Sequence, residues 1–381
     1  MYSVLLKTSE ATATVCTTEK EKRALYMWKY HVLICSLFMM VGAFIGFSLP
    51  MYISGVTITP LDLVIALIVA VISIPIHVLI HEAGHLLFGK LSGYRFLSFR
   101  LFSYMWVMDG ERIRFKRLTT PGIIGQCLMI PPPFKEGEAF PYRLYLAGGV
   151  LLNVLVSIGV VGLSLIFNIQ SLSILIAATL GAFIACLNLI PISISDGATL
   201  KKCIKNHDMR WLLYVQLRVN AEMTQGKRYA ELDPRFLNRP MSIDHDDPFQ
   251  WFIKFLTYYI ELDKGAYETA WIQLKDMWDQ LDTKHFYHPS LKKEWLFYRL
   301  MTNQLDQLNV EQSFLTGKQL IDRRLQAWYQ WKVEKNAKGA LATCEKALQE
   351  TIYHTNKGHF KVEAQFINEL KADIAHTSQI G

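Results

Sequence analysis

The longest charge-free run of this chain limits its fold more strongly than any other feature. Residues 144–195 are 52 consecutive positions without Asp, Glu, Lys or Arg. About 20 apolar residues in helical conformation cross the hydrocarbon core of a bilayer. The run therefore predicts two membrane-spanning helices, at 144–167 and 172–195, with a short polar turn between them.

Two further apolar runs lie nearer the N-terminus. Residues 31–52 carry no charge, and residues 63–89 carry only Glu82. Because 51% of all residues are hydrophobic and 19% are charged, the composition argues against a purely cytosolic enzyme. A large soluble protein with buried helices is disfavoured, since four such runs are too many for one core. The sequence predicts an all-α polytopic membrane protein with four transmembrane helices.

Basic residues near the span ends predict the orientation of these helices. Lys and Arg are frequent in the first 30 residues, between 90 and 143, and directly after 200, whereas 53–60 and 168–171 contain none. Residues 1–30 lack the apolar middle region of a cleaved signal peptide and are interpreted as a cytosolic tail. Both termini are expected to be cytosolic. A bacterial plasma membrane fits this layout, and an organellar or endoplasmic reticulum membrane would obey the same rules.

Charge and cysteine content exclude several other classes of protein. The net charge of +7 is spread over the whole chain, which is too weak and dispersed an excess to indicate nucleic acid as a partner. The six cysteines show no CxxC spacing. Neither a disulfide framework nor a thiolate metal site is therefore predicted.

The loop between the second and third spans predicts some β structure. Residues 96–108 are rich in aromatic and branched apolar residues, and Ile113 and Phe115 alternate with basic residues at 112, 114 and 116. With the turn dipeptide Asp109-Gly110 between them, these segments are typical of a hairpin over about 96–118, close to the membrane surface. The hairpin has two interpretations, an edge strand that receives an extended peptide or a simple cap on the helices. Three consecutive prolines exclude regular helix over 125–133, so an ordered loop or re-entrant piece is expected there.

Helical periodicity dominates from residue 201 onward. We expect a juxtamembrane linker at 201–250 and a cytosolic helical domain at 251–381. The segments around Ala270 and Ala340 resemble second helices of tetratricopeptide hairpins and lie about two 34-residue repeats apart. A degenerate tetratricopeptide-like domain and a generic helical bundle both fit this pattern. Either would offer a surface for a protein partner.

One short motif in the second apolar run carries chemistry. His81, Glu82 and His85 form H-E-x-x-H. On a helix the two histidines share one face and can ligate one Zn²⁺, while Glu82 is turned by about 100° and reaches a metal-bound water. Charged groups at a helix centre in a bilayer cost about 2.5–3.5 kcal/mol and normally mark a function. The other interpretation is a set of satisfied polar residues at a helix end.

A catalytic zinc site needs a third protein ligand and an open fourth position. Asp196 closes the charge-free run at the end of the fourth predicted span. The second and fourth spans both end at the cytosolic face in the predicted topology, so Asp196 can meet the two histidines at one depth. Alternatively, Asp196 only marks the membrane interface.

Together the motifs resemble the site-2 protease family of intramembrane zinc metalloproteases, whose members pair H-E-x-x-H with N-x-x-P-x-P-x-L-D-G on a later span. Asn188, Pro191, Asp196 and Gly197 match the second motif, while Ser193 and Ser195 replace its second proline and its leucine. The family signature A-G-P-x-x-N resembles residues 148–153, with Asn153 kept and the proline lost. The resemblance covers roughly residues 65–200.

The resemblance implies one zinc ion per chain, bound by His81, His85 and Asp196, with Glu82 as general base and later general acid. It implies an assisting role for Asn153 and Asn188, at the developing oxyanion or on the substrate backbone, although interhelical hydrogen bonds explain each asparagine equally well. The substrate would be a membrane-anchored peptide or regulatory protein, cut in or near its membrane segment. The loop of about 50 residues between the second and third spans is too short for a PDZ domain as well as the hairpin.

Two other functions stay open from the sequence. A catalytically silent membrane scaffold could recruit partners through the cytosolic helical domain, or the zinc site could carry out chemistry other than proteolysis. The spacing of His77, His81 and His85 also suggests a membrane di-iron oxygenase. We reject this hypothesis because such sites need many more imidazoles. His77, one turn below the metal, is interpreted either as a residue that supports the ligands or as one that faces the lumen.

Overall fold

We analysed a computed structural model of the chain. It describes residues 57–117, 124–133, 140–191, 195–237, 247–282, 285, 287–306, 308, 310–317, 319–349 and 356–380, together with positions 39, 42, 46, 50 and 52. The chain divides into two compact units, one formed by Met1–Phe88 with Arg143–Lys201 and the other by Gly89–Tyr142 with Lys202–Gly381. The predicted N-terminal tail, and all but five positions of the predicted first span, lie outside the described residues.

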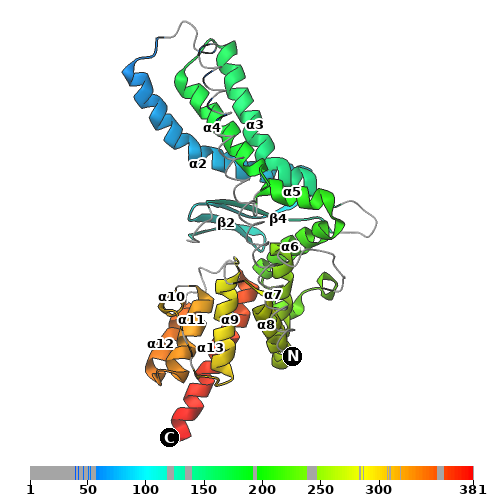
Figure 1. The fold of residues 1–381 in the computed structure, drawn as a ribbon, viewed down its shortest axis with the longest axis vertical. Coiled ribbons are helices and arrows are strands. Elements are labelled where there is room, and N and C mark those ends of the chain that lie inside the picture. The colour runs from blue at the N-terminus through cyan, green and yellow to red at the C-terminus, as the bar shows by residue number, and fades with distance from the viewer. Residues whose placement is uncertain are drawn as a thin grey trace, which may run out of the picture. The chain divides into compact units, whose positions relative to one another are not determined.

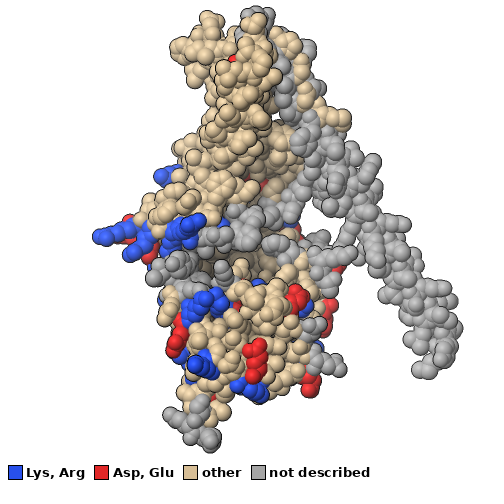
Figure 2. All heavy atoms as spheres, turned by 90° about the vertical axis from the view of Figure 1, so that its left-hand side faces the viewer, with Lys and Arg blue, Asp and Glu red and all other residues tan. Residues whose placement is uncertain are grey.

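The first unit contains three helices that are long and apolar enough to cross a membrane: α2 (Pro60–Leu91), α3 (Tyr142–Ile166) and α4 (Leu172–Leu189). Their outward side chains are apolar, and this part of the molecule is almost free of charged atoms in Figure 2. α3 and α4 run side by side in Figure 1. The three spans predicted within the described residues therefore correspond to helices of membrane-spanning length, and association with a membrane follows.

α4 ends six residues earlier than the predicted span, which was expected to continue to residue 195. Its start is capped by Ser171, whose hydroxyl accepts the backbone N–H of Ile174 at 3.3 Å. At its end Ile190 is extended, with φ −63° and ψ 126°. Pro191 explains this, because a proline disfavours helical geometry in the residue before it and supplies no backbone N–H.

The predicted hairpin is part of a larger antiparallel sheet in the second unit. Its strands are β1 (Arg95–Leu101), β2 (Tyr104–Asp109), β3 (Arg112–Arg117) and β4 (Gly125–Ile130), in the order β3-β2-β1-β4. The β2–β3 turn lies one residue later than predicted, at Gly110-Glu111, since Asp109 still pairs with Arg112. Gly110 has φ +64°, which suits the first position of a two-residue hairpin turn. The loop prediction was wrong for residues 125–130, which pair with β1. The prolines begin only at Pro131, so they end β4 without preventing it.

The rest of the described chain is helical. Its elements are α5 (Asp196–Lys205), α6 (His207–Gln225), η1 (Tyr229–Glu231), η2 (Pro234–Phe236), α7 (Pro248–Asp263), α8 (Tyr267–Gln280), α9 (His288–Met301), α10 (Gln312–Thr316), α11 (Leu320–Lys332), α12 (Ala337–Gln349) and α13 (Lys357–Ile380). Much of the segment predicted as a linker is thus helix. Ala270 and Ala340 are fully buried in the core shared by α7 to α13. The tetratricopeptide-like repeat stays a prediction.

A charged cluster is buried inside this helical core. The Arg324 guanidinium on α11 donates to both carboxylate oxygens of Glu294 on α9, at 2.9 Å each, and to Oε1 of Glu363 on α13 at 3.0 Å. All three side chains have 0% exposure. Tyr258 and Tyr259 on α7 donate their hydroxyls to Glu294. The cluster therefore joins four helices around one arginine.

The stability of these helices is expected to fall as pH rises above 4.5. Burial raises the pKa of Glu363 above its ordinary value of 4.5, and Arg324 offsets only part of that rise. The folded state then keeps a proton that the unfolded state has lost, so the free energy of unfolding decreases with increasing pH. Urea unfolding of the full chain, followed by tryptophan fluorescence, measures this because six of its nine tryptophans lie within 251–381. Glu363→Gln, which cannot ionise, should make the decline shallower, and an unchanged decline would contradict the assignment.

Candidate metal centre

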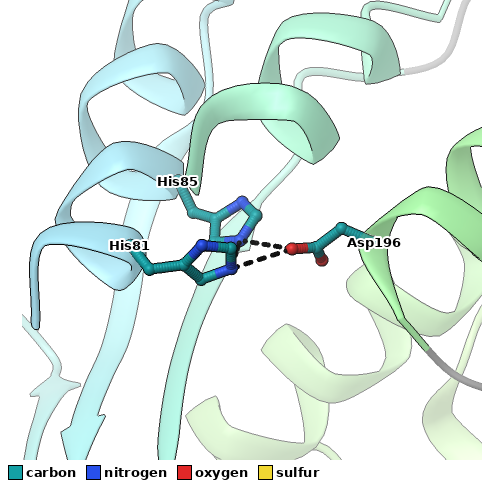
Figure 3. Close-up of side chains that lie close together, drawn as sticks. All are labelled: His81, His85 and Asp196. Carbon is teal, nitrogen blue, oxygen red and sulfur yellow. Dashed lines mark hydrogen bonds and ion pairs between the residues drawn. The ribbon is translucent and has the colours of Figure 1, made fainter. Parts of the chain in front are cut away.

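His81 and His85 lie one helical turn apart on α2, and Asp196 begins α5 (Figure 3). The Nε2 atom of His81 is 2.9 Å from Oδ2 of Asp196, and Nε2 of His85 is 3.2 Å from the same oxygen. The two Nε2 atoms are 3.3 Å apart. Both histidines are more than nine-tenths buried. The three side chains thus converge on one point, although His81 and Asp196 are 115 positions apart in the sequence.

A backbone hydrogen bond fixes the protonation of His85. Its Nδ1 lies 2.7 Å from the carbonyl oxygen of Tyr145 on α3. Because a carbonyl only accepts, Nδ1 carries a proton, and Nε2 is the atom of His85 that would bind a metal. A histidine that ligates a metal usually has its second nitrogen held in this way.

Local backbone geometry explains the position of Asp196. Ser195 caps α5, since its hydroxyl accepts the Ala198 backbone N–H at 3.1 Å and donates to the Ile190 carbonyl at 2.6 Å. A Cβ on Gly197 would lie 2.0 Å from the carbonyl oxygen of Leu189, so only glycine fits beside the end of α4. Ser195, which departs from the family motif, therefore supports the aspartate. The other departure, Ser193, lies outside the described residues.

The electrostatics of the site favour an ionised Asp196. Burial by itself would raise the pKa of this carboxyl group, but hydrogen bonds from His81 and His85 lower the pKa below its ordinary range. The ionised carboxylate is the form that binds a metal.

Glycines let α3 approach the histidine helix closely. A Cβ on Gly84 of α2 would lie 2.2 Å from the carbonyl oxygen of Gly148, so the two backbones touch. A Cβ on Gly149 would lie 2.5 Å from Cε1 of His81, so this glycine makes room for the imidazole ring. From the sequence, the Gly148-Gly149 pair was predicted only as part of a family signature. Their small size was the sequence signal that could have indicated close packing of α3 against α2, because small residues let membrane helices approach each other.

The donor set fits a zinc ion. Zinc binds histidine nitrogen and carboxylate oxygen at about 2.0–2.2 Å, and ligands at such distances in a tetrahedron stand about 3.3–3.5 Å apart. The observed separations of 2.9, 3.2 and 3.3 Å are close to those edges. Among the described residues, this is the group of histidine, cysteine and acidic side chains whose geometry could hold an ion. Three protein ligands would leave a fourth position for water or substrate.

The remaining predicted site residues occupy different surroundings. Glu82 is on α2 between the histidines and is 8% exposed. Asn153 on α3 is fully buried, and its Oδ1 lies 3.2 Å from Nδ1 of His77. Asn188 donates its side-chain N–H to the carbonyl of Ile184 in its own helix, at 2.9 Å. The assisting roles of the two asparagines stay predictions.

Comparisons with known proteins give no relative. No family model matches the chain, and neither curated proteins nor solved structures produce a match. Function must therefore be argued from the site itself.

Proposed function

We propose that this chain is an intramembrane zinc metalloprotease similar to the site-2 proteases. Its substrate would be a membrane-anchored peptide or regulatory protein, hydrolysed in or near its membrane segment. The observation that carries the proposal is the convergence of His81, His85 and Asp196, whose ligand atoms lie within 4.8 Å of one another. Two of them belong to a helix of membrane-spanning length.

The residues divide the chemistry of peptide hydrolysis between them. His81, His85 and Asp196 would hold the zinc, and Glu82, adjacent to His81, would serve as the base. A zinc ion in such a site lowers the pKa of water from 15.7 to about 7 and polarises the scissile carbonyl. Glu82 takes a proton from the attacking water and returns it to the leaving nitrogen, which makes one carboxylate base and then acid. Its burial, at 8% exposure, keeps bulk water away from this proton.

Membrane burial supports a protease over a structural zinc protein. A structural site normally has four protein ligands, whereas three are present here within the described residues. Helices whose outer surfaces are apolar also give access to a substrate that is itself anchored in the bilayer. A catalytically silent scaffold that recruits partners through residues 251–381 is the alternative.

Metal content tests the proposal. Elemental mass spectrometry on detergent-purified protein should give one zinc per chain. Asp196→Ala should weaken zinc binding by more than about 100-fold, because loss of a ligand costs more than loss of an outer partner, which costs about 10–100-fold. Asp279→Ala, which removes an exposed aspartate from α8, is the matched control and should keep its zinc.

Each result has a definite meaning. Zinc present in the parent chain and lost in Asp196→Ala, at equal helical content by circular dichroism, supports the three-ligand site. No zinc in the parent chain, or full retention without Asp196, contradicts it and makes the scaffold the better interpretation. If zinc is bound but no co-expressed single-span membrane protein is cleaved, the result contradicts proteolysis and favours a different zinc-dependent reaction.

A further inference from the structure

A second buried polar group lies one turn below the histidine pair. His77 on α2 is 5% exposed and precedes His81 by four residues, so both project from the same face. Its Nδ1 lies 3.2 Å from the Asn153 carboxamide on α3, and its Nε2 lies 3.0 Å from the carbonyl oxygen of Ala177 on α4. One side chain thus makes hydrogen bonds to both neighbouring membrane helices.

The partners determine how a neutral His77 must be protonated. The Ala177 carbonyl only accepts, so Nε2 carries the proton and Nδ1 must accept. The carboxamide then has to present its N–H group, Nδ2, to Nδ1, which amounts to exchanging its nitrogen and oxygen relative to the structure. The exchange also gives a partner to Nδ2, a fully buried nitrogen that otherwise has none.

Packing around the ring shows that the helices are shaped to hold it. A Cβ on Gly181 of α4 would lie 2.2 Å from Cε1 of His77 and 2.4 Å from the hydroxyl oxygen of Ser157 on α3. Only glycine therefore allows α4 to close over the imidazole. Ser157 is 6% exposed, so the polar junction is enclosed by α2, α3 and α4.

We propose that His77 is a positioning residue of the metal centre, which sets the register of α4 against α2 and so the approach of Asp196 to the two histidines. This proposal rests on the proposed zinc site. α2 carries both histidine ligands, whereas Asp196 follows α4 after a short connection. The proposed ligands therefore come from separate parts of the chain, and His77 bonds α2 to α4 one turn from His81.

Zinc affinity and ligand geometry test this role without reference to catalysis. His77→Phe keeps a ring of similar size but removes both hydrogen bonds, and it should weaken zinc binding by about tenfold, as loss of an outer partner does. His77→Gln retains one donor and one acceptor and should recover most of the affinity. The visible absorption spectrum of the Co²⁺-substituted protein should change in His77→Phe, because it reports the arrangement of the ligands. Thr179→Val is the control, since its hydroxyl bonds only within α4, to Leu175.

Gly181→Ala provides a second test that leaves His77 intact. A methyl group at this position displaces the imidazole, so zinc affinity should fall as in His77→Phe. It decides the question if His77→Phe does not fold. Unchanged affinity and cobalt spectrum in the folded variant, or an equal loss in Thr179→Val, would overturn the positioning role while the zinc site stands. Absence of zinc from the parent chain would instead refute the proposed function, and the positioning role with it.

Discussion

Glu82→Gln is expected to abolish cleavage while the chain keeps one zinc ion. Glutamine has the same shape as glutamate but cannot take up or return a proton at this position. Loss of a positioned general base lowers the rate by about 10²–10⁴-fold. Because the proposed ligands are His81, His85 and Asp196, the metal content should stay that of the parent chain.

The measurement pairs cleavage with metal analysis on the same preparations. Cleavage is followed by co-expression with a panel of tagged single-span membrane proteins, and zinc by elemental mass spectrometry. Glu268→Gln is the matched control, since Glu268 is an exposed glutamate on α8. If the Glu82 variant still cut at the parental rate, Glu82 would not be the base and the proposed mechanism would fail. Loss of both zinc and cleavage would mean that Glu82 is needed to hold the metal site together, and not only as a base.

The sequence singled out three candidate ligands because a membrane makes ionisable residues scarce, and the structure brings their side chains together. His81, His85 and Asp196 stand at the limits of long apolar runs, where few alternatives exist. The packing that brings them together was not predictable in the same way. Whether Gly149 faces an imidazole depends on the rotation of α3 against α2, and no periodicity in a uniformly apolar helix reveals that rotation.

Two other features show where sequence patterns stop being informative. The strand β4 was missed because its prolines follow it directly, and its pairing with β1 is a long-range contact that local propensity does not contain. The end of α4 was placed too late because hydrophobicity continues past Leu189 while Pro191 ends the helix. In both cases the backbone determined where the element ends or pairs, through hydrogen bonding in β4 and through Pro191 in α4, and residue composition did not.

The buried arginine of the helical domain was equally invisible, because Arg324 lies in a segment of ordinary soluble composition. Its burial predicts a large effect on stability. Arg324→Leu would leave the buried Glu294 carboxylate without its counter-charge, and removal of one partner from a buried ion pair costs about 3–5 kcal/mol. The guanidinium also lies 3.7 Å over the ring of Phe297, and that contact is lost as well.

Urea unfolding followed by tryptophan fluorescence measures this loss, and two variants define its origin. Arg235→Leu removes an arginine that is 84% exposed and paired with Asp233, so it should cost less than about 1 kcal/mol. Replacing Arg324, Glu294 and Glu363 together by leucine removes every unpaired charge and should recover part of the stability. Recovery should be incomplete, because Tyr258 and Tyr259 then lose their acceptor at about 1–3 kcal/mol for each buried hydroxyl. An Arg324→Leu variant as stable as Arg235→Leu would contradict a stabilising role for the buried ion pair.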